Sequence, residues 1–153
     1  MIAIAFRVYG TPAPQGSKRH VGNGVMVESS AKVRPWRQDV KYAALAAHEA
    51  ACPDRGSVHF LKGVPVVVAV RFYLPRPRSH YRSGANVHLL RDAAPKWPSN
   101  KPDLDKLARS TLDALGEAGI FHDDSQVAHM VITKDYADHL ESVGAGITIQ
   151  ERP

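Results

Sequence analysis

Residues 65–74, PVVVAVRFYL, are apolar and mostly β-branched or aromatic along almost their whole length. Such side chains suit the pleated, half-buried surface of a sheet, so this run predicts a strand. Residues 2–9, IAIAFRVY, alternate apolar with small or polar side chains and predict another. Two more strands are predicted over 125–137 and 144–150, and we expect these two to pair with each other across a turn near 137–144.

Two segments carry apolar residues at the 3–4 spacing of an amphipathic helix. In the first, residues 32–51, we interpret Trp36 as a core anchor, and Ser29 or Ser30 as a candidate cap. In the second, residues 102–117, leucines 104, 107, 112 and 115 share one face, and the sequence GEAG ends the helix.

The resulting order is β-α-β-α-β-β, which predicts an α+β fold with two main helices packed on a mixed or antiparallel sheet. A length of 153 residues with 44% hydrophobic content suits a single domain spanning residues 1–153. The lone Cys52 excludes an intramolecular disulfide. The apolar start of the chain lasts six residues without a basic lead-in, so we expect no membrane segment and a cytoplasmic protein.

Charge is distributed unevenly along the chain. Residues 1–100 hold 15 Lys and Arg against 5 Asp and Glu, whereas residues 101–153 hold 5 against 10. The basic part indicates a polyanionic partner such as DNA, because Lys and Arg neutralise phosphates and release counterions. Carboxylates facing the same phosphates would repel them unless a divalent cation lay between.

Two irregular segments concentrate basic side chains. Residues 10–24 predict a loop, or a short hairpin that turns at Gly22–Gly24. Residues 75–101 form a long segment in which arginines are interleaved with aromatic residues, a pattern suited to phosphate contacts and base stacking. Tyr81 or Trp97 is the candidate for stacking. A surface excursion without binding function is the alternative for both. The candidate DNA contacts are Lys18, Arg19, Arg76, Arg78, Tyr81, Arg82, Lys96, Lys101 and Lys106.

Four aspartates flank the second predicted helix: Asp103 and Asp105 at its start, and Asp123 and Asp124 after its end. Each has a structural explanation, as a helix-dipole partner, a turn residue, or a member of a salt-bridge ladder. If the connector at 118–124 runs back along the helix, these carboxylates converge into a site for Mg²⁺, or alternatively Mn²⁺. In a basic protein such a site indicates metal-assisted phosphodiester hydrolysis.

Residues 101–127, KPDLDKLARSTLDALGEAGIFHDDSQV, closely resemble the central motif of the RusA family of Holliday-junction resolvases, found in phages, prophages and some bacteria. The resemblance implies a homodimeric, Mg²⁺-dependent endodeoxyribonuclease. It would nick branched DNA symmetrically in recombination and repair. It also implies that Asp103, Asp105 and Asp124 are catalytic and bind metal, with Asp123 as a supporting or alternative ligand.

One position departs from the family pattern, because Arg109 stands where well-known members carry a catalytic lysine. Arginine keeps the positive charge that stabilises a developing oxyanion, but it cannot act as a general acid. Lys101 and Lys106 are nearby alternatives. Two other functions remain open: a branched-DNA-binding protein without catalysis, and a metal-dependent phosphoesterase acting on small nucleotides.

Overall fold

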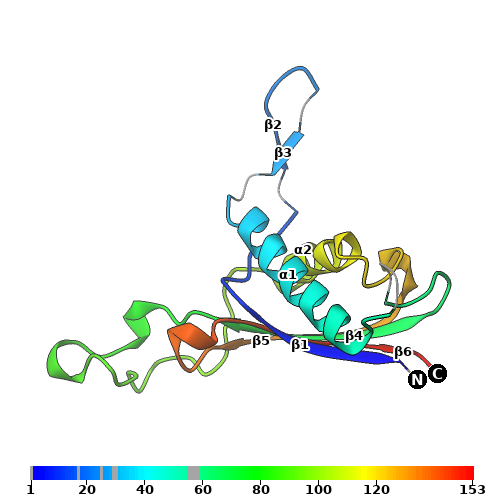
Figure 1. The fold of residues 1–153 in the computed structure, drawn as a ribbon. Helices are drawn as coiled ribbons and strands as arrows, with labels where there is room; N and C mark the ends of the chain where they lie inside the picture. Colours follow the sequence, from blue (N-terminus) through cyan, green and yellow to red (C-terminus); the bar gives the residue numbers. More distant parts are fainter. Residues whose placement is uncertain (1, 17, 25, 29–30, 55–58) are drawn as a thin grey trace.

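The structure, a computed structural model, describes residues 2–16, 18–24, 26–28, 31–54 and 59–153. Its main sheet contains β1 (Ala3–Tyr9), β4 (Val66–Leu74), β5 (Val127–Tyr136) and β6 (Gly144–Glu151). Helices α1 (Val33–Ala51) and α2 (Leu104–Glu117) lie together on one face of this sheet (Figure 1). The predicted α+β class, with two helices on a mixed sheet, is confirmed.

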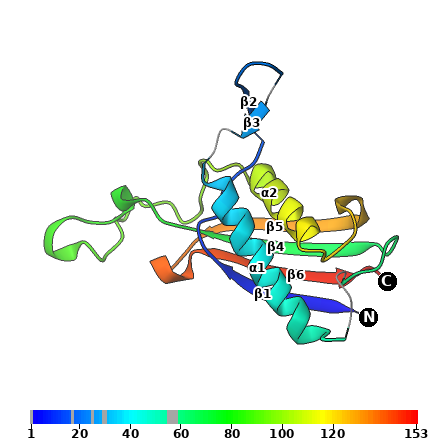
Figure 2. The same ribbon diagram turned by 45° about the horizontal axis from the view of Figure 1, so that its top comes forward.

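The sheet order is β1-β6-β4-β5, as Figure 2 shows. β6 pairs antiparallel with both β1 and β4, whereas β4 and β5 pair in parallel. The predicted pairing of the last two strands is therefore wrong. The chain leaves β4, crosses through α2 and returns in the same direction as β5, which is the connection that parallel strands require. β6 then enters between β1 and β4, where Ile147 and Ile149 are buried.

The core lies between the sheet and the two helices. Trp36 of α1 is fully buried, packs 6.3 Å from the Phe72 ring, and donates a hydrogen bond from Nε1 to Thr111 Oγ1 of α2 at 3.2 Å. Its predicted role as a core anchor is confirmed. α1 begins at Val33, directly after Lys32, and the candidate caps Ser29 and Ser30 lie outside the described residues.

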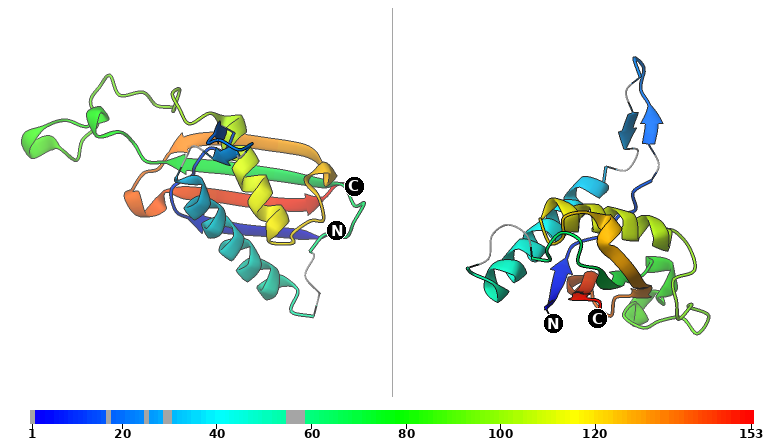
Figure 3. Two further views of the ribbon diagram at one scale, coloured as in Figure 1. Left: turned by 90° about the horizontal axis from the view of Figure 1, so that it is seen from above. Right: turned by 90° about the vertical axis from the view of Figure 1, so that its right-hand side faces the viewer.

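Within the described parts of the chain, no helix covers the opposite face of the sheet (Figure 3). It carries a cation–aromatic cluster in which the Arg7 guanidinium lies 4.0 Å from the Tyr73 ring centroid. Arg71 forms an ion pair with Asp135 on the same face, and the hydrogen bond and charge of that carboxylate raise the pKa of Arg71.

Two excursions leave the sheet. The short antiparallel pair β2 (Lys18–His20) and β3 (Met26–Glu28) confirms the predicted hairpin and projects beyond the helices. Residues 75–101 form an arm at the end of β4, drawn in green at the left of Figure 1. It contains the short 3-10 turns η1 (Arg78–His80) and η2 (Gly84–Asn86). Two further turns, η3 (Asp124–Gln126) and η4 (Leu140–Ser142), flank β5. None of the described helices is both long and apolar enough to cross a membrane.

Candidate metal and DNA-binding site

The start of α2 presents two carboxylates. Asp103 is the residue before the helix and has extended backbone geometry, and Asp105 is in the first turn. The Asp103 side chain does not cap the helix; its Oδ2 lies 3.3 Å from Lys106 Nζ, and it is 45% exposed. Asp105 is exposed. Both carboxylates are therefore accessible beside the positive end of the helix dipole.

Hydrogen bonds to two other parts of the chain hold α2 in place. Lys134 of β5 donates from Nζ to the Asn100 carbonyl at 2.6 Å and to the Pro102 carbonyl at 3.0 Å. From the other side, Ser110 Oγ donates to the Ala13 carbonyl at 2.6 Å, which joins the 10–16 loop to α2. Sequence reasoning missed the role of Lys134. The only hint in the sequence is that Lys134, two residues after Ile132 in β5, lies on the same face of the strand, which packs against the helices.

Arg109 is exposed one helical turn after Asp105. Within the described residues, no ion pair joins it to Asp105 or to Asp113. Asp113 instead accepts a hydrogen bond from Gln15 Nε2 at 2.6 Å and lies 3.9 Å from Arg37 Nη1. The salt-bridge ladder that the spacing allowed is therefore not formed, and the Arg109 guanidinium faces solvent beside the first two aspartates.

Asp123 and Asp124 occupy the turn before β5 and have different surroundings. Asp123 caps η3, because its Oδ1 accepts the Ser125 backbone N–H at 2.8 Å. Hydrogen bonds from the Ser125 side chain and backbone lower the pKa of Asp123. Gln126 anchors the turn by donating to the carbonyls of Leu61 and Val64, both at 2.9 Å. Asp124 is exposed and does not cap the turn, so its carboxylate is accessible to a ligand.

The two acidic ends of α2 do not meet within one chain. The start of α2 is hydrogen-bonded to Lys134, which lies opposite Phe72 near the end of β4. Gln126, in the turn that carries Asp124, is hydrogen-bonded to residues before β4, and the next residue, Val127, lies opposite Val66 at the start of β4. Seven residues of strand separate those positions, about 20 Å. Figure 3 likewise shows the segment after α2 at the opposite end of β5 from the start of the helix. The connector does not run back along α2.

The donor set of one protomer is accordingly incomplete. Across the described part of the chain, no three His, Cys, Asp or Glu side chains lie close enough to hold one metal ion. Asp103 and Asp105 supply the hard oxygens that Mg²⁺ prefers, but only from two residues. These two carboxylates could supply part of the ligands of a metal ion. Asp124 could supply a further ligand, but it lies at a different end of the molecule.

The predicted DNA contacts fall into three groups. In the first group, the guanidinium groups already bind the arm itself. Arg76 donates to the Pro95 carbonyl at 2.7 Å and lies 4.1 Å from the Tyr136 ring centroid. Arg82 lies 3.2 Å from Asp92 and also donates to the Leu90 carbonyl. These two arginines shape the arm, which leaves less of their hydrogen-bonding capacity for DNA.

The second group consists of exposed or partly exposed side chains. Arg78, Lys96 and Lys101 are exposed, and Trp97, 57% exposed, has Lys96 Nζ 5.0 Å from its ring centroid. Tyr81 is half-buried beside Arg78, and Lys106 is engaged with Asp103. In the third group, Lys18 and Arg19 belong to β2, but the structure does not describe their side chains.

Comparison with known proteins agrees with the motif at 101–127. The profile of the family described as Endodeoxyribonuclease RusA matches residues 9–150, which is nearly the whole chain. No curated protein matches it. The chain therefore belongs to the RusA endodeoxyribonuclease family, and this membership implies an endonuclease that resolves Holliday junctions.

Proposed function

We propose that this protein is a metal-dependent endonuclease that resolves four-way DNA junctions by paired, symmetric nicks, in recombination and repair within a bacterial or phage-infected cytoplasm. The observation that carries the proposal is the exposed pair Asp103 and Asp105 at the start of α2, inside a family match that covers residues 9–150. Around this pair lie exposed cationic side chains that suit a phosphate backbone.

Asp103, Asp105 and Asp124 are the proposed ligands for Mg²⁺, with Mn²⁺ as an alternative. Such an ion supplies an activated water and neutralises charge on the scissile phosphate. The remaining roles belong to the chain itself. Asp123 keeps its carboxylate on the Ser125 N–H and so holds the turn that presents Asp124. Arg109 is aimed at the same side as Asp105, where its charge stabilises the transition state without donating a proton.

The separation of the acidic ends favours a homodimer in which each site is shared. Asp124 of one copy would complete the site of Asp103 and Asp105 in the other. A two-fold axis makes two such sites, which is what symmetric nicking of a four-way junction needs.

The outer edge of β5 is the proposed contact between copies. It is the last strand of the sheet and has ten residues, and Met130 and Val131 are 40% and 51% exposed. A long, apolar edge strand is a ready template for pairing with another strand. Antiparallel pairing of two β5 strands about a two-fold axis sets the start of one strand beside the C-terminal half of the other. Those are the positions of Asp124 and of the Lys134-anchored start of α2.

Exposed residues on the arm and near α2 supply the proposed DNA contacts. Arg78, Lys96 and Lys101 would follow the phosphate backbones of the junction arms, and Trp97 would stack on an opened base. Lys18 and Arg19 on the hairpin are proposed as further phosphate contacts.

The proposal is tested by incubating the protein with a synthetic four-way junction, with and without Mg²⁺. Paired nicks at symmetric positions only with metal support it, and an intact junction under both conditions refutes it. Asp103→Asn should abolish nicking and retain junction binding, whereas Asp54→Asn, an exposed aspartate outside the site, should leave both unchanged. A protein without catalysis would show no nicking to lose. A phosphoesterase of small nucleotides would hydrolyse them and bind junctions without strong salt dependence.

A further inference from the structure

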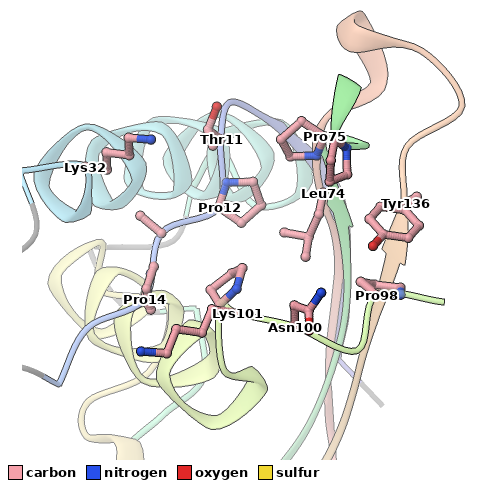
Figure 4. Close-up of a pocket in the computed structure, with 13 residues that line it drawn as sticks. Thr11, Pro12, Pro14, Lys32, Leu74, Pro75, Pro98, Asn100, Lys101 and Tyr136 are labelled. Atoms are coloured by element: carbon pink, nitrogen blue, oxygen red, sulfur yellow. The ribbon is translucent and has the colours of Figure 1, made fainter. Parts of the chain in front are cut away.

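A pocket opens beside the start of α2, next to the proposed metal ligands. Its volume is about 280 Å³, and Asn100, Lys101 and Pro102, the three residues before Asp103, form one wall. The opposite wall comes from the loop after β1, and the floor comes from the ends of β4 and β5 (Figure 4). Thr11 at the start of that loop also lines the pocket.

The composition of the lining indicates the kind of ligand. Six prolines, Leu74 and the Tyr136 ring make an apolar interior, whereas the charged groups are two lysines, Lys32 and Lys101. No carboxylate occurs among the described residues that line it. Asn100 directs its side-chain amide into the hollow (Figure 4). Flat apolar surfaces suit the faces of a nucleobase, and one amide can hydrogen-bond its polar edge. Cations at the rim suit the phosphates of the same strand, which stay outside the pocket.

The walls are held in fixed positions. The Tyr136 ring is clamped by Arg76, 4.1 Å from its centroid, and by His80, whose ring meets it edge-on at 5.5 Å. Lys134 binds the carbonyls of Asn100 and Pro102, and Ser110 binds the Ala13 carbonyl. A preformed pocket spares the ligand the cost of ordering loops and side chains around it.

We propose that this pocket binds a single unstacked nucleobase of the DNA strand that enters the site at Asp103. The inference rests on the proposed function in taking DNA as the partner. A volume of about 280 Å³ lies just below the roughly 300–1,000 Å³ typical of ligand pockets, so it suits one ring system and not a whole nucleotide. Lys32 and Lys101 then face the phosphates on either side of that base, and Asn100 meets its polar edge.

The functional consequence concerns where the strand is cut. A base held in a pocket whose wall continues directly into Asp103 sets the position of the neighbouring phosphate relative to the metal ligands. The pocket therefore positions one phosphate by holding the base next to it.

The test compares a short single-stranded DNA oligonucleotide with the same oligonucleotide carrying a central abasic site. Binding is measured by fluorescence anisotropy in metal-free buffer. Loss of the base should weaken binding by about tenfold, the range of one base–aromatic stack. Thr11→Trp, an exposed substitution that fills the pocket, should remove this difference. Thr148→Trp, the same change on the far face of the sheet, should preserve it. Tyr136→Leu, which keeps the wall apolar without the ring, should reduce the difference.

The outcomes separate this proposal from the proposed function, which is read by junction cleavage. A protein that cuts junctions but binds both oligonucleotides equally overturns the base pocket alone. A protein that distinguishes the two oligonucleotides but never cuts a junction overturns the nuclease proposal and retains the pocket. If Thr11→Trp and wild type show the same abasic effect, the base binds elsewhere and the pocket assignment is wrong. Binding to neither oligonucleotide overturns the pocket and points to an apolar side chain of another protein as its ligand.

Discussion

Asp103 precedes the first residue of α2, and Asp124 ends the connector that follows the helix. One protomer therefore holds them apart by about the length of the helix, roughly 20 Å for 14 residues. A single Mg²⁺ cannot bind both side chains across that distance, since carboxylate oxygens coordinate metals at 2–3 Å. The proposed dimer, in which each site is shared between two copies, would bring these side chains together.

Co-expression of Asp103→Asn and Asp124→Asn chains should restore nicking that neither variant shows alone. In a mixed dimer with shared sites, one site carries both substitutions and the other carries none. Random pairing should therefore recover roughly one quarter of wild-type sites. Junction nicking by the purified, co-expressed mixture of chains is the measurement. If each site lay within one chain, every site in the mixture would carry a substitution and no activity would return.

Val131→Lys should produce a folded monomer without nuclease activity. A lysine on the exposed edge of β5 opposes strand pairing, as charges on natural edge strands do. Light scattering gives the mass in solution, and circular dichroism checks the fold. Val87→Lys is the matched control, because Val87 on the arm is similarly exposed, at 48%, but lies away from β5. A Val131→Lys protein that stays dimeric and active would exclude the β5 contact.

Arg109→Ala should lower the rate of nicking by about 10²-fold or more, the typical effect of removing one group that stabilises transition-state charge. Arg109→Lys should retain most of the activity, because the charge is what the role needs. Junction affinity should change little in either variant. Single-turnover cleavage under saturating protein separates the rate from binding. Equal losses in the Ala and Lys variants would instead indicate a role for the planar guanidinium.

Thr111→Val should destabilise the fold by about 1–3 kcal/mol, since the buried Trp36 Nε1–H would lose its acceptor while the volume stays nearly the same. The free energy of unfolding from urea titration is the measurement. Thr148→Val on the exposed sheet face should have little effect. A neutral result at Thr111 would show that the Trp36 indole finds another acceptor.

Asp123→Ala should lower the melting temperature at neutral pH, because the carboxylate caps the turn before β5. The pKa of Asp123 is below its ordinary value of 3.8 in the folded protein, so the stabilisation is present above that value. It is lost as pH falls through the lower, folded pKa. Melting temperatures of the two proteins should therefore converge in acid. A difference independent of pH would assign the effect to the turn backbone and not to the charge.

Local sequence patterns predicted most of the helices and strands. Periodicity alone predicted α1 and α2, because an apolar stripe at 3–4 spacing has one way to be buried. β4 followed from its β-branched run, and the hairpin at β2 and β3 from its glycines, since these signals are read within a few residues. The strand partners were different. β5 and β6 are neighbours in the chain, yet each pairs with β4 and they do not pair with each other.

For the site, the sequence by itself identified the candidate side chains: four carboxylates around one helix, an arginine one turn along it, and basic residues in two excursions. Only the tertiary structure decided how they combine. Lys134 and Gln126 tie the two ends of the acidic segment to opposite ends of β5, and hydrogen bonds between residues tens of positions apart leave no periodic trace in the chain. The same long-range packing separates Asp103 from Asp124 and builds the pocket beside α2, because both depend on which elements meet in space.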